Sequence, residues 1–420
     1  MKIELKYGKA TICLSLPDNT LVELVKPRIE RPRREPIDIV KSSLNNPLNS
    51  PQLSELVDKT GPDPSVTITV EDHTRPVPKD KILPPLLKKL IASGVSEKKV
   101  TILVATGLHR DLTGEETRDL RKIVGDGPAI VNHNADNPDE LKDMGELSYG
   151  GNTKRKFSVN RYLTASDITI LTGDVEFHYL FGYGGGAKSI LPGTADTDSV
   201  SFNHSLMDLP GARAGNLDNP LRNAAEMAAD LVGVDFSVNV VLSPEKEILS
   251  CYSGEVHESF AAAVNRVDEL YKVPYDDRAE LVIVEAGGYP KDIDLYQAQK
   301  AVESGLELVK PGGELVLLAQ CPEGWGSSTF RDWVETVDDL NQTEKMIKEN
   351  FVIGGHKAYI YAKEKRRANL FLVSDLEDNS HLRKIFTSIS IGDLEERAIE
   401  ANSISVLKLG SSTMPVKEKN

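Results

Sequence analysis

The densest group of potentially reactive residues lies near the middle of the chain. Four of the five residues from Gly182 to Gly186 are glycines, and Lys188 follows them after a single alanine. Histidines stand on both sides, at His178 and His204. Closely spaced glycines let the backbone approach a ligand and donate amide N–H groups to a phosphate. A lysine amine and two imidazoles beside such a backbone favour a cofactor or metal site over the alternative, a Gly-rich turn with an exposed, inactive lysine.

Two nucleotide-binding motifs nearly match this stretch. Residues 182–189 fit a P-loop in which alanine replaces the second glycine, and residues 182–187 fit the dinucleotide fingerprint. Both motifs require a strand directly before the glycines and a helix directly after them. Here a histidine-bearing segment precedes the glycines, and Pro192–Gly193 would end such a helix early. Neither nucleotide loop is therefore the preferred interpretation.

Three ionisable residues each follow a predicted strand. Asp72 comes after VTITV, His109 after VTILVATG and His178 after ITILTG. Carboxyl ends of parallel strands meet at one edge of an open α/β sheet, and ligands bind at that edge. The three residues therefore predict a single crevice. For Asp72 and its neighbour Arg75, the alternative is a structural ion pair within a turn.

Strands and helices alternate from Val66 onward, which predicts an α/β fold with mostly parallel sheets covered on both faces. A long helical segment, 256–272, is followed by the polar sequence PYDD, after which the alternation restarts with LVIVEAGG. We therefore expect an N-terminal α/β domain over residues 1–273, which contains the Gly-rich stretch, and a smaller α/β domain over residues 274–420. The active site is expected in the cleft between them.

Shorter patterns predict local structure. The first sixteen residues alternate apolar and polar side chains and predict a hairpin that turns at Gly8–Lys9. The Pro-rich stretch 27–64 is expected to be a loop with one short helix. Thr113-x-x-Glu116 is typical of a helix-starting capping box, and Asp294-x-x-Gln297 is typical of another.

The bulk composition excludes several classes of protein. With 420 residues, of which 40% are hydrophobic and 27% charged, the chain is an ordinary globular protein too long for one core. A formal net charge of −14 argues against nucleic acid or an anionic membrane as the main partner. Its three cysteines are far apart, which argues against a disulfide framework or a thiolate metal site. Without a signal peptide or a membrane-spanning apolar run, a cytoplasmic location is expected.

Taken together, the motifs resemble those of the nickel-pincer lactate racemases, a family of 2-hydroxy acid racemases and epimerases. The matching segments occur in order along the chain: Asp72-His73-Thr74-Arg75, Thr106-Gly107-Leu108-His109-Arg110, His178-Tyr179, Gly182 to Lys188, Pro192-Gly193, Asn203-His204 with Met207, and Tyr296-Gln297 with Lys300. The resemblance thus covers residues from about 70 to 300.

The resemblance implies a cofactor that brings most of the metal site with it. By this likeness, Lys188 is attached covalently to a pyridinium-3,5-bisthiocarboxylic acid mononucleotide, the nickel-pincer cofactor. The organic ligand provides three donors to nickel and His204 supplies the fourth, so no protein metal cluster is needed. Asp72 and Gly184, Gly185 and Gly186 are expected to contact the cofactor, and Asp72 could also orient Arg75 or a histidine. Enzymes of cofactor synthesis are then expected partners.

The same resemblance implies how the substrate is handled. It selects His109 and His178 as two bases on opposite sides of a 2-hydroxy acid. Arg75 and Lys300 are expected to bind the substrate carboxylate, with Tyr296 and Gln297 as supporting hydrogen-bond partners. The implied activity is racemisation of a small 2-hydroxy acid, lactate first, by hydride transfer to and from the cofactor through a 2-keto acid.

Three alternatives remain at this stage. The substrate could be another 2-hydroxy acid, such as malate, phenyllactate or a sugar acid, because the hydroxyl and carboxylate are common to all of them. The chain could be a nicotinamide-dependent dehydrogenase that uses the Gly-rich loop and reduces added NAD. It could also be a non-catalytic carrier of the cofactor, although the paired histidines argue against this.

Overall fold

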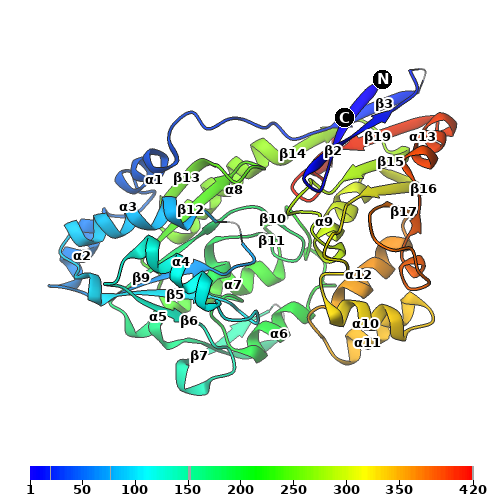
Figure 1. Ribbon diagram of the computed structural model, residues 1–420. Coiled ribbons are helices and arrows are strands. Elements are labelled where there is room, and N and C mark those ends of the chain that lie inside the picture. Colours follow the sequence, from blue (N-terminus) through cyan, green and yellow to red (C-terminus); the bar gives the residue numbers. More distant parts are fainter. Residues whose placement is uncertain (19, 76, 150–152, 419–420) are drawn as a thin grey trace. The chain divides into compact units, whose positions relative to one another are not determined.

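The computed structural model describes residues 1–18, 20–75, 77–149 and 153–418. The chain forms two compact units (Figure 1). The first unit consists of residues 29–268, and the second consists of residues 1–28 together with 269–420. Each unit is built on its own six-stranded sheet. Both sheets are mostly parallel, which confirms the predicted α/β class.

The sheet of the first unit has the order β13-β12-β9-β4-β5-β6. Only β13 runs antiparallel to its neighbour. The bounds are β4 Val66–Glu71, β5 Val100–Ala105, β6 Ala129–Asn132, β9 Ile168–Asp174, β12 Phe236–Leu242 and β13 Ile248–Gly254. The central strands are buried along nearly their whole length because helices cover both faces, as their β-branched runs predict.

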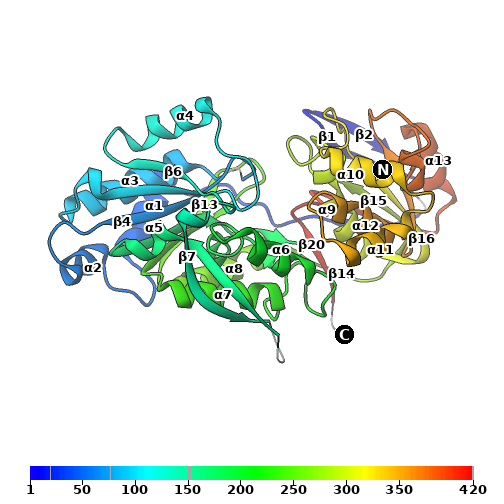
Figure 2. The same ribbon diagram turned by 90° about the horizontal axis from the view of Figure 1, so that it is seen from below.

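Helices α1 to α4 pack on one face of this sheet, where Val40, Leu53, Ile82 and Leu120 join the apolar core with strand residues such as Ile68. Figure 2 shows α3 and α4 on one side of the strands and α7 and α8 on the other. The helices of the unit are α1 Pro36–Asn45, α2 Leu53–Thr60, α3 Lys79–Ala92, α4 Gly114–Val124, α5 Arg161–Ala165, α6 Thr197–Ser205, α7 Pro220–Val232 and α8 Val256–Tyr271.

Two local predictions can be compared directly with these helices. The capping box at Thr113 and Glu116 is present at the start of α4, as predicted. The prediction of a single short helix between residues 27 and 64 was wrong, because the stretch contains both α1 and α2. Each of these helices buries two apolar residues spaced four apart, Val40 with Leu44 and Leu53 with Val57. One turn of apolar spacing is therefore enough to anchor each of them to the sheet.

Short antiparallel pairs complete the first unit. They are β7 Leu141–Ser148 with β8 Lys154–Asn160, and β10 Phe177–His178 with β11 Gly182–Tyr183. The β10–β11 pair bears the Gly-rich stretch and follows directly on the end of β9.

The second unit has an entirely parallel sheet in the order β18-β17-β16-β15-β19-β3. Its strands are β3 Leu21–Val25, β15 Ala279–Glu285, β16 Val309–Leu318, β17 Asn369–Val373, β18 Thr387–Ser388 and β19 Ser403–Leu407. A separate parallel pair joins β14 Lys272–Tyr275 to β20 Met414–Lys417. The helices are α9 Leu295–Leu306, α10 Ser328–Thr336, α11 Thr343–Glu349, α12 Gly355–Lys365 and α13 Ile391–Glu400.

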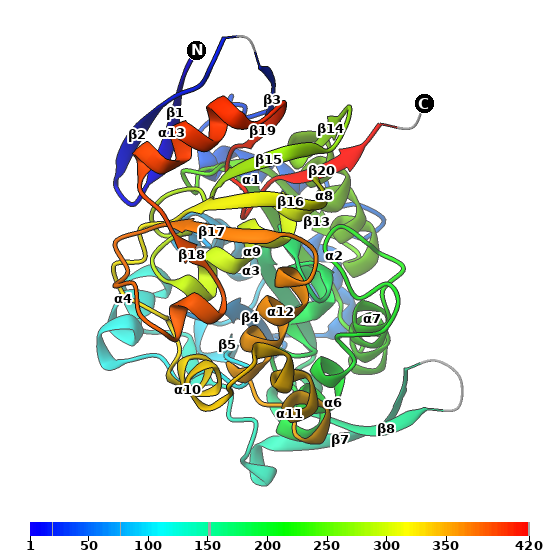
Figure 3. The same ribbon diagram turned by 90° about the vertical axis from the view of Figure 1, so that its right-hand side faces the viewer.

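The N-terminal hairpin forms as predicted, with β1 Lys2–Tyr7 and β2 Ala10–Ser15 joined at Gly8–Lys9. It groups with the second unit, whereas the sequence placed it in a domain of residues 1–273. Figure 3 shows the hairpin and α13 on one side of the second sheet and α9 and α12 on the other. The cause is packing: Leu5 and Leu14 share a core with Ile283 and Val316, and β3 pairs with β19.

Among the described residues, we find no helix with the length and apolar character that crossing a membrane requires.

Candidate active site

His109 and Asp72 form a hydrogen-bonded pair beyond the ends of the neighbouring strands β5 and β4. Nδ1 of His109 lies 2.6 Å from Oδ2 of Asp72. Only 3% of the Asp72 side chain is exposed, compared with 48% of the His109 side chain. Thr74 donates to the other carboxylate oxygen, through its backbone N–H at 2.9 Å and its hydroxyl at 2.6 Å. Asp72 therefore orients a histidine, one of the roles that the sequence allowed for it.

The electrostatics of Asp72 define the tautomer of His109. Burial raises the pKa of the Asp72 carboxyl, but the hydrogen bonds from His109 and Thr74 outweigh burial and lower the pKa well below its ordinary value. An ionised Asp72 accepts the Nδ1–H of His109, which leaves the lone pair on Nε2. A half-exposed imidazole with a free lone pair on Nε2 and a carboxylate at Nδ1 is the arrangement of a general base.

Arg75 lies among three carboxylates from the ends of two strands, β4 and β9. Its Nη1 atom is 3.4 Å from Oε1 of Glu176. Burial lowers the pKa of the guanidinium, but Glu176, Glu71 and Asp174 outweigh burial and raise it. The side chain thus pairs with Glu176, and the alternative of an Asp72–Arg75 ion pair is not what the structure shows. With 21% of its side chain exposed, Arg75 can still meet an anionic ligand.

Glu71 and Asp174 end the adjacent strands β4 and β9 as a buried carboxyl pair. The backbone N–H of Asp174 donates to Oε2 of Glu71 at 3.4 Å. Burial and the neighbouring Asp174 raise the pKa of Glu71 well above its ordinary value, and burial and Glu176 raise that of Asp174. Two neighbouring buried carboxyls favour sharing a proton over ionisation of both groups.

The backbone of the Gly-rich stretch, residues 182–186, forms a tightly packed Gly-rich frame in which two positions fit only glycine. Gly185 and Gly186 have φ angles of 75° and 57°. A Cβ on Gly185 would lie 2.7 Å from the carbonyl oxygen of Asp174, and one on Gly186 would lie 2.8 Å from the Phe260 ring. The amides of Gly184 and Gly186 donate to the backbone oxygen of Glu176 at 2.8 Å and to Oδ1 of Asn239 at 3.1 Å. Packing therefore requires glycine at positions 185 and 186, whereas a Cβ on Gly184 would make only ordinary contacts, the nearest at 3.6 Å.

Arg222 of α7 stabilises the Gly-rich frame through hydrogen bonds to its backbone. It is buried, lies 4.3 Å from the centre of the Phe260 ring, and donates to the backbone oxygens of Tyr183 and Gly185. After the glycines comes a short 3₁₀ turn, Gly186–Ser189, in place of a long helix. A P-loop or a dinucleotide fingerprint requires a helix directly after the glycines, so the stretch is neither of these motifs.

Lys188 lies on that turn, and its amine is poised to react. Burial, followed by repulsion from Arg75, lowers its pKa to about 7, so a large fraction of the amine is neutral at neutral pH. Its Nζ atom is 5.5 Å from the centre of the Phe181 ring. A neutral lysine amine on a rigid backbone is a nucleophile suited to forming a covalent bond with a cofactor.

His204 near the end of α6 is held as a neutral imidazole. Its Nδ1 atom lies 2.9 Å from the carbonyl oxygen of Val200, which can only accept, so Nδ1 carries the proton. Burial, with a smaller contribution from Lys188, lowers its pKa to about 4. The lone pair is then on Nε2. A histidine that donates its other N–H to a backbone carbonyl is typical of a metal ligand.

His178 has the opposite hydrogen-bond pattern to His109. Its Nδ1 atom accepts from the backbone N–H groups of Leu180 at 3.2 Å and Phe181 at 3.3 Å, so in the neutral ring the proton is on Nε2. The side chain is buried. Its ring stacks on Tyr179 at 5.0 Å between centroids and meets the edge of Phe181 at 5.4 Å.

Phe181 links the members of this group. Its ring lies 5.5 Å from that of His204, in addition to its contacts with His178 and Lys188. Lys188 also interacts electrostatically with Arg75 and Asp72, and His204 with His109. The structure therefore brings together the predicted site residues of the first unit: Asp72, Arg75, His109, His178, Gly184, Gly185, Gly186, Lys188 and His204.

The remaining predicted residues are on α9 of the second unit. Asp294 caps this helix by accepting from the backbone N–H of Gln297 at 2.7 Å. Tyr296 and Lys300 are one helical turn apart and so share a face. The Tyr296 ring meets His356 edge-on at 6.0 Å, and Nζ of Lys357 lies 4.9 Å from its centre.

The sequence analysis missed several residues of this site. Glu71, Asp174 and Glu176 carry a usable signal, since each stands at or just past a strand end. Phe181 and Arg222 carry no comparable signal, because their roles depend on contacts between distant parts of the chain. A metal would have to be held mainly by a bound group, because no three His, Cys, Asp or Glu side chains within the described ranges are arranged as a metal site.

These features define an α/β enzyme of two units, the first of which brings together a buried lysine, Lys188, and three histidines, His109, His178 and His204. Residues 7–215 match the family model for the lactate racemase N-terminal domain, and residues 275–407 match that for the lactate racemase C-terminal domain. The chain belongs to the lactate racemase family and is an isomerase of the racemase type.

Known relatives cover nearly the whole chain. The lactate racemase of Lactiplantibacillus plantarum is 32% identical over 386 residues, which are 90% of this chain and 89% of that protein. The lactate racemase of Thermoanaerobacterium thermosaccharolyticum is 29% identical over 412 residues, 96% of this chain and 94% of that protein. The structure of the lactate racemase apoprotein from the latter organism matches with a TM-score of 0.89 and 27% identity, over 99% of this chain and 100% of that one.

A protein from Thermotoga maritima shares the fold alone, with a TM-score of 0.65 and 19% identity over 91% of this chain and 98% of that one.

Proposed function

We propose that this chain interconverts the enantiomers of a small 2-hydroxy acid, with lactate as the first candidate substrate. The observation that carries the proposal is the presence in one unit of a carboxylate-backed histidine, His109, a buried histidine, His178, and a buried lysine whose pKa is lowered to about 7, Lys188. The named relatives are lactate racemases, and their identity to this chain extends over both units.

The chemistry explains why two histidines and a cofactor are needed together. The C2 hydrogen of lactate is poorly acidic beside an ionised carboxylate, so its direct removal as a proton is unfavourable. Loss of the hydrogen as hydride leaves a planar 2-keto acid, to which hydride can return on either face. When bound, the nickel-pincer nucleotide supplies the hydride acceptor and donor. The protein must then remove the hydroxyl proton of one enantiomer and return a proton to form the other.

The two histidines fit these proton transfers. Nε2 of His109 bears a lone pair and can take the hydroxyl proton, while Asp72 stabilises the charge that develops. Nε2 of His178 is proposed as the complementary donor. His178 must first be an imidazolium to serve in this role, because a neutral ring that lost its Nε2 proton would become an anion, and the second proton requires Nδ1 to give up the N–H groups of Leu180 and Phe181. Arg75 binds the substrate carboxylate, because a guanidinium makes two parallel hydrogen bonds to that group.

Lys188 and His204 are the proposed attachment point and metal ligand. The pKa of about 7 provides the neutral amine that bond formation with an activated carboxyl derivative of the nucleotide requires. His204 offers Nε2 as one donor to nickel. Asp72 and the glycines 184–186 are proposed cofactor contacts. Cofactor-synthesis enzymes are the proposed partners, in a cytoplasmic setting that suits three free cysteines.

Lys300, Tyr296 and Gln297 are proposed to contact the substrate from the second unit. Lys300→Ala should raise KM for the 2-hydroxy acid sharply while the mass of the attached cofactor stays unchanged. An unchanged kcat/KM would remove Lys300 from the substrate site and leave the rest of the proposal intact.

The decisive experiment combines mass spectrometry of the cofactor-bearing peptide with a chiral assay of substrate turnover. The chain is co-expressed with cofactor-synthesis enzymes, and the peptide containing Lys188 should gain mass that is absent from Lys188→Ala, with about one nickel per chain. A chiral assay over lactate, malate and phenyllactate then identifies the substrate. With substrate deuterated at C2, product formed in ordinary water should retain much of the label. Complete early washout would overturn the hydride route, and reduction of added NAD would favour a dehydrogenase instead.

A further inference from the structure

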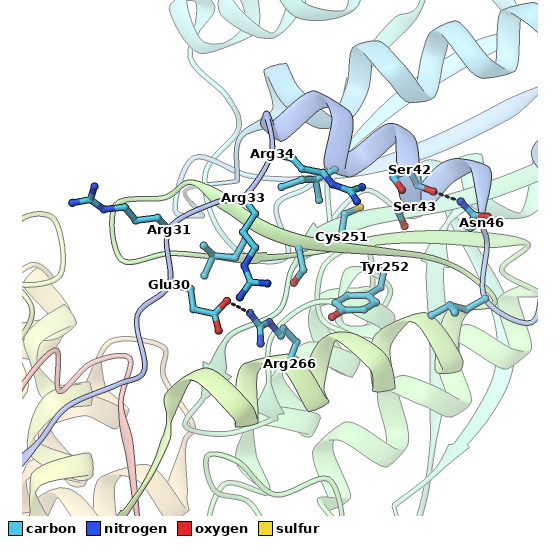
Figure 4. A pocket seen from close by; sticks show the side chains of 14 residues that line it. Glu30, Arg31, Arg33, Arg34, Ser42, Ser43, Asn46, Cys251, Tyr252 and Arg266 are labelled. Carbon is cyan, nitrogen blue, oxygen red and sulfur yellow. Dashed lines mark hydrogen bonds and ion pairs between the residues drawn. The ribbon is translucent and has the colours of Figure 1, made fainter.

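A second pocket lies at the β13 edge of the first unit, outside the site described above. Its cavity volume is about 510 Å³, within the range of small-molecule sites. It is formed by the segment 30–34, by α1, by β13 and by Arg266 of α8 (Figure 4). None of the residues that line it belongs to the group around Phe181.

The lining is strongly positive for a chain with a net charge of −14. Four arginines line the pocket, at positions 31, 33, 34 and 266, and Glu30 is the single carboxylate among the described lining residues. Glu30 is already engaged, with Oε2 lying 2.6 Å from Nη2 of Arg266. Arg33 and Arg34 are exposed, and their side chains make no ion pair or hydrogen bond with any residue that the structure describes.

The guanidinium groups are not scattered over an open surface. In Figure 4, Arg33 extends toward the Glu30–Arg266 pair, and Arg34 extends toward Ser42 and Cys251. Arg31 points away from both of them in this view. Arg33, Arg34 and Arg266 therefore approach one cavity from two segments, which suits a compact group with several anionic oxygens. Guanidinium groups recognise phosphate through pairs of parallel hydrogen bonds.

The rest of the lining distinguishes an organic phosphate from an inorganic ion. Leu249 and the ring of Tyr252 provide a non-polar wall along β13. Ser250 lies between Leu249 and Cys251, and its hydroxyl is buried without a hydrogen-bond partner in the described part of the chain. An orphaned buried hydroxyl is costly unless a ligand or water satisfies it. The pocket thus offers cations and an apolar wall together, with the unpartnered hydroxyl of Ser250 buried beside them.

We propose that this pocket binds a phosphorylated small molecule, with the phosphate held by Arg33, Arg34 and Arg266 and the organic part against Leu249 and Tyr252. The segment that carries Arg33 and Arg34 connects β3 of the second unit to α1 of the first. A ligand here would therefore contact the segment between β3 and α1 without touching the residues proposed for racemisation.

The test is equilibrium binding of ATP to the full chain at low ionic strength, with adenosine and inorganic phosphate as comparison probes. ATP should bind with a stoichiometry of one, and binding should weaken as salt is added. Adenosine, which lacks the phosphates, should not bind measurably. Inorganic phosphate should bind at least about tenfold more weakly than ATP, because it cannot reach the apolar wall.

Matched charge reversals locate the site. Arg33→Glu and Arg34→Glu should each weaken ATP binding at least about tenfold, because each removes a charge-assisted contact and adds repulsion. Arg118→Glu makes the same charge change on an exposed arginine of α4, which follows β5 and is far in the strand order from the β13 edge, and this variant should bind ATP like the wild type. Unchanged melting temperatures establish that the variants fold. Absence of ATP binding, or equal weakening in all three variants, would overturn the proposal.

Discussion

Two groups of residues in the candidate active site differ in the charge state that their surroundings favour. Asp72 and His109 form the first group, the His109 side, and Lys188 and His204 beside Phe181 form the second, the Phe181 side. On the His109 side, Asp72 is held ionised by His109 and Thr74, and its pKa is lowered well below the ordinary value. On the Phe181 side, burial lowers the pKa of Lys188 to about 7 and that of His204 to about 4, so both groups tend to be neutral. One side is built to bear the charge of a transferred proton. The other keeps nitrogen lone pairs available, as the proposed cofactor attachment and metal ligation require.

The histidines of the two sides differ in the same sense. His109 faces a carboxylate and is 48% exposed, whereas His178 faces two backbone N–H donors and is buried. Protonation of His178 at Nδ1 would bring two N–H groups, those of Leu180 and Phe181, against a third, which disfavours the charged ring. The two bases are thus unlike in surroundings even if the substrate enantiomers they serve are mirror images.

The largest expected effect is loss of either histidine. His109→Ala and His178→Ala should each lower kcat at least about 1,000-fold in both directions, because every turnover needs one group as base and the other as acid. The equilibrium between enantiomers is fixed at unity, so neither variant can become a one-way enzyme. Chiral assays of both directions measure the loss, with His381→Ala as a control outside the site.

Added imidazole separates the two sides further. It should partly restore His109→Ala, whose missing side chain leaves a solvent-accessible space beside Asp72, and should not restore His178→Ala. Equal rescue of both variants would contradict the difference in burial on which the comparison depends.

The next effect is on the orientation of His109. Asp72→Asn keeps the size of the side chain but can donate its amide to Nδ1, which fixes the wrong tautomer and removes the lone pair from Nε2. We expect a fall in kcat of about 100-fold. Thr74→Val removes only the 2.6 Å hydroxyl bond to Asp72 and should cost less than about tenfold. Equal, small effects of both changes would show that Asp72 is not the orienting group.

A smaller effect concerns the reactivity of Lys188 in the protein without cofactor. With a pKa of about 7, its neutral fraction rises about tenfold between pH 6 and pH 8 and then levels off. Acylation of the Lys188 peptide, followed by mass spectrometry, should show this plateau, whereas an ordinary lysine continues to gain reactivity toward pH 10.

Arg75 provides the matched variant for this measurement. Arg75→Gln removes the repulsion that helps to lower the pKa of Lys188, so the midpoint should move to higher pH. A Lys188 profile without a plateau below pH 9 in the wild-type chain would mean that the amine is not held neutral.

Features that depend on local sequence could be predicted, and features that depend on distant contacts could not. The capping box at Thr113, the N-terminal hairpin and the strands before Asp72 and His109 all follow from patterns a few residues long. The grouping of residues 1–28 with the second unit depends on the pairing of β3 with β19, almost 400 residues later in the chain.

The same division holds within the site. Strand ends placed Asp72, His109 and His178 at one edge, because that edge is common to parallel sheets. Neither the support of the Gly-rich frame by Arg222 nor the hydrogen bond from Gly186 to Asn239 leaves a trace in local spacing. Contacts between residues that are distant in the sequence can be identified only from the three-dimensional structure.

The smallest expected effect comes from Glu71, directly before Asp72 in the chain but with its pKa shifted in the opposite direction. Burial and Asp174 raise the pKa of Glu71 well above its ordinary value, so folding favours the protonated form of this carboxyl. An acid with a raised folded-state pKa contributes stability that is complete below its unfolded pKa, near 4.3, and is lost as the pH rises through the folded value. Glu71→Gln mimics the protonated form at every pH. It should therefore leave racemisation nearly unchanged, in contrast to Asp72→Asn, and change the free energy of unfolding at pH 6 by less than about 1 kcal/mol.

Above pH 6 the variant should lose less stability than the wild type as the pH rises, which melting temperatures from pH 5 to pH 9 measure. A steeper loss in the variant, or a fall in activity as large as that of Asp72→Asn, would show that Glu71 acts as an anion and that the two neighbouring carboxyls are alike.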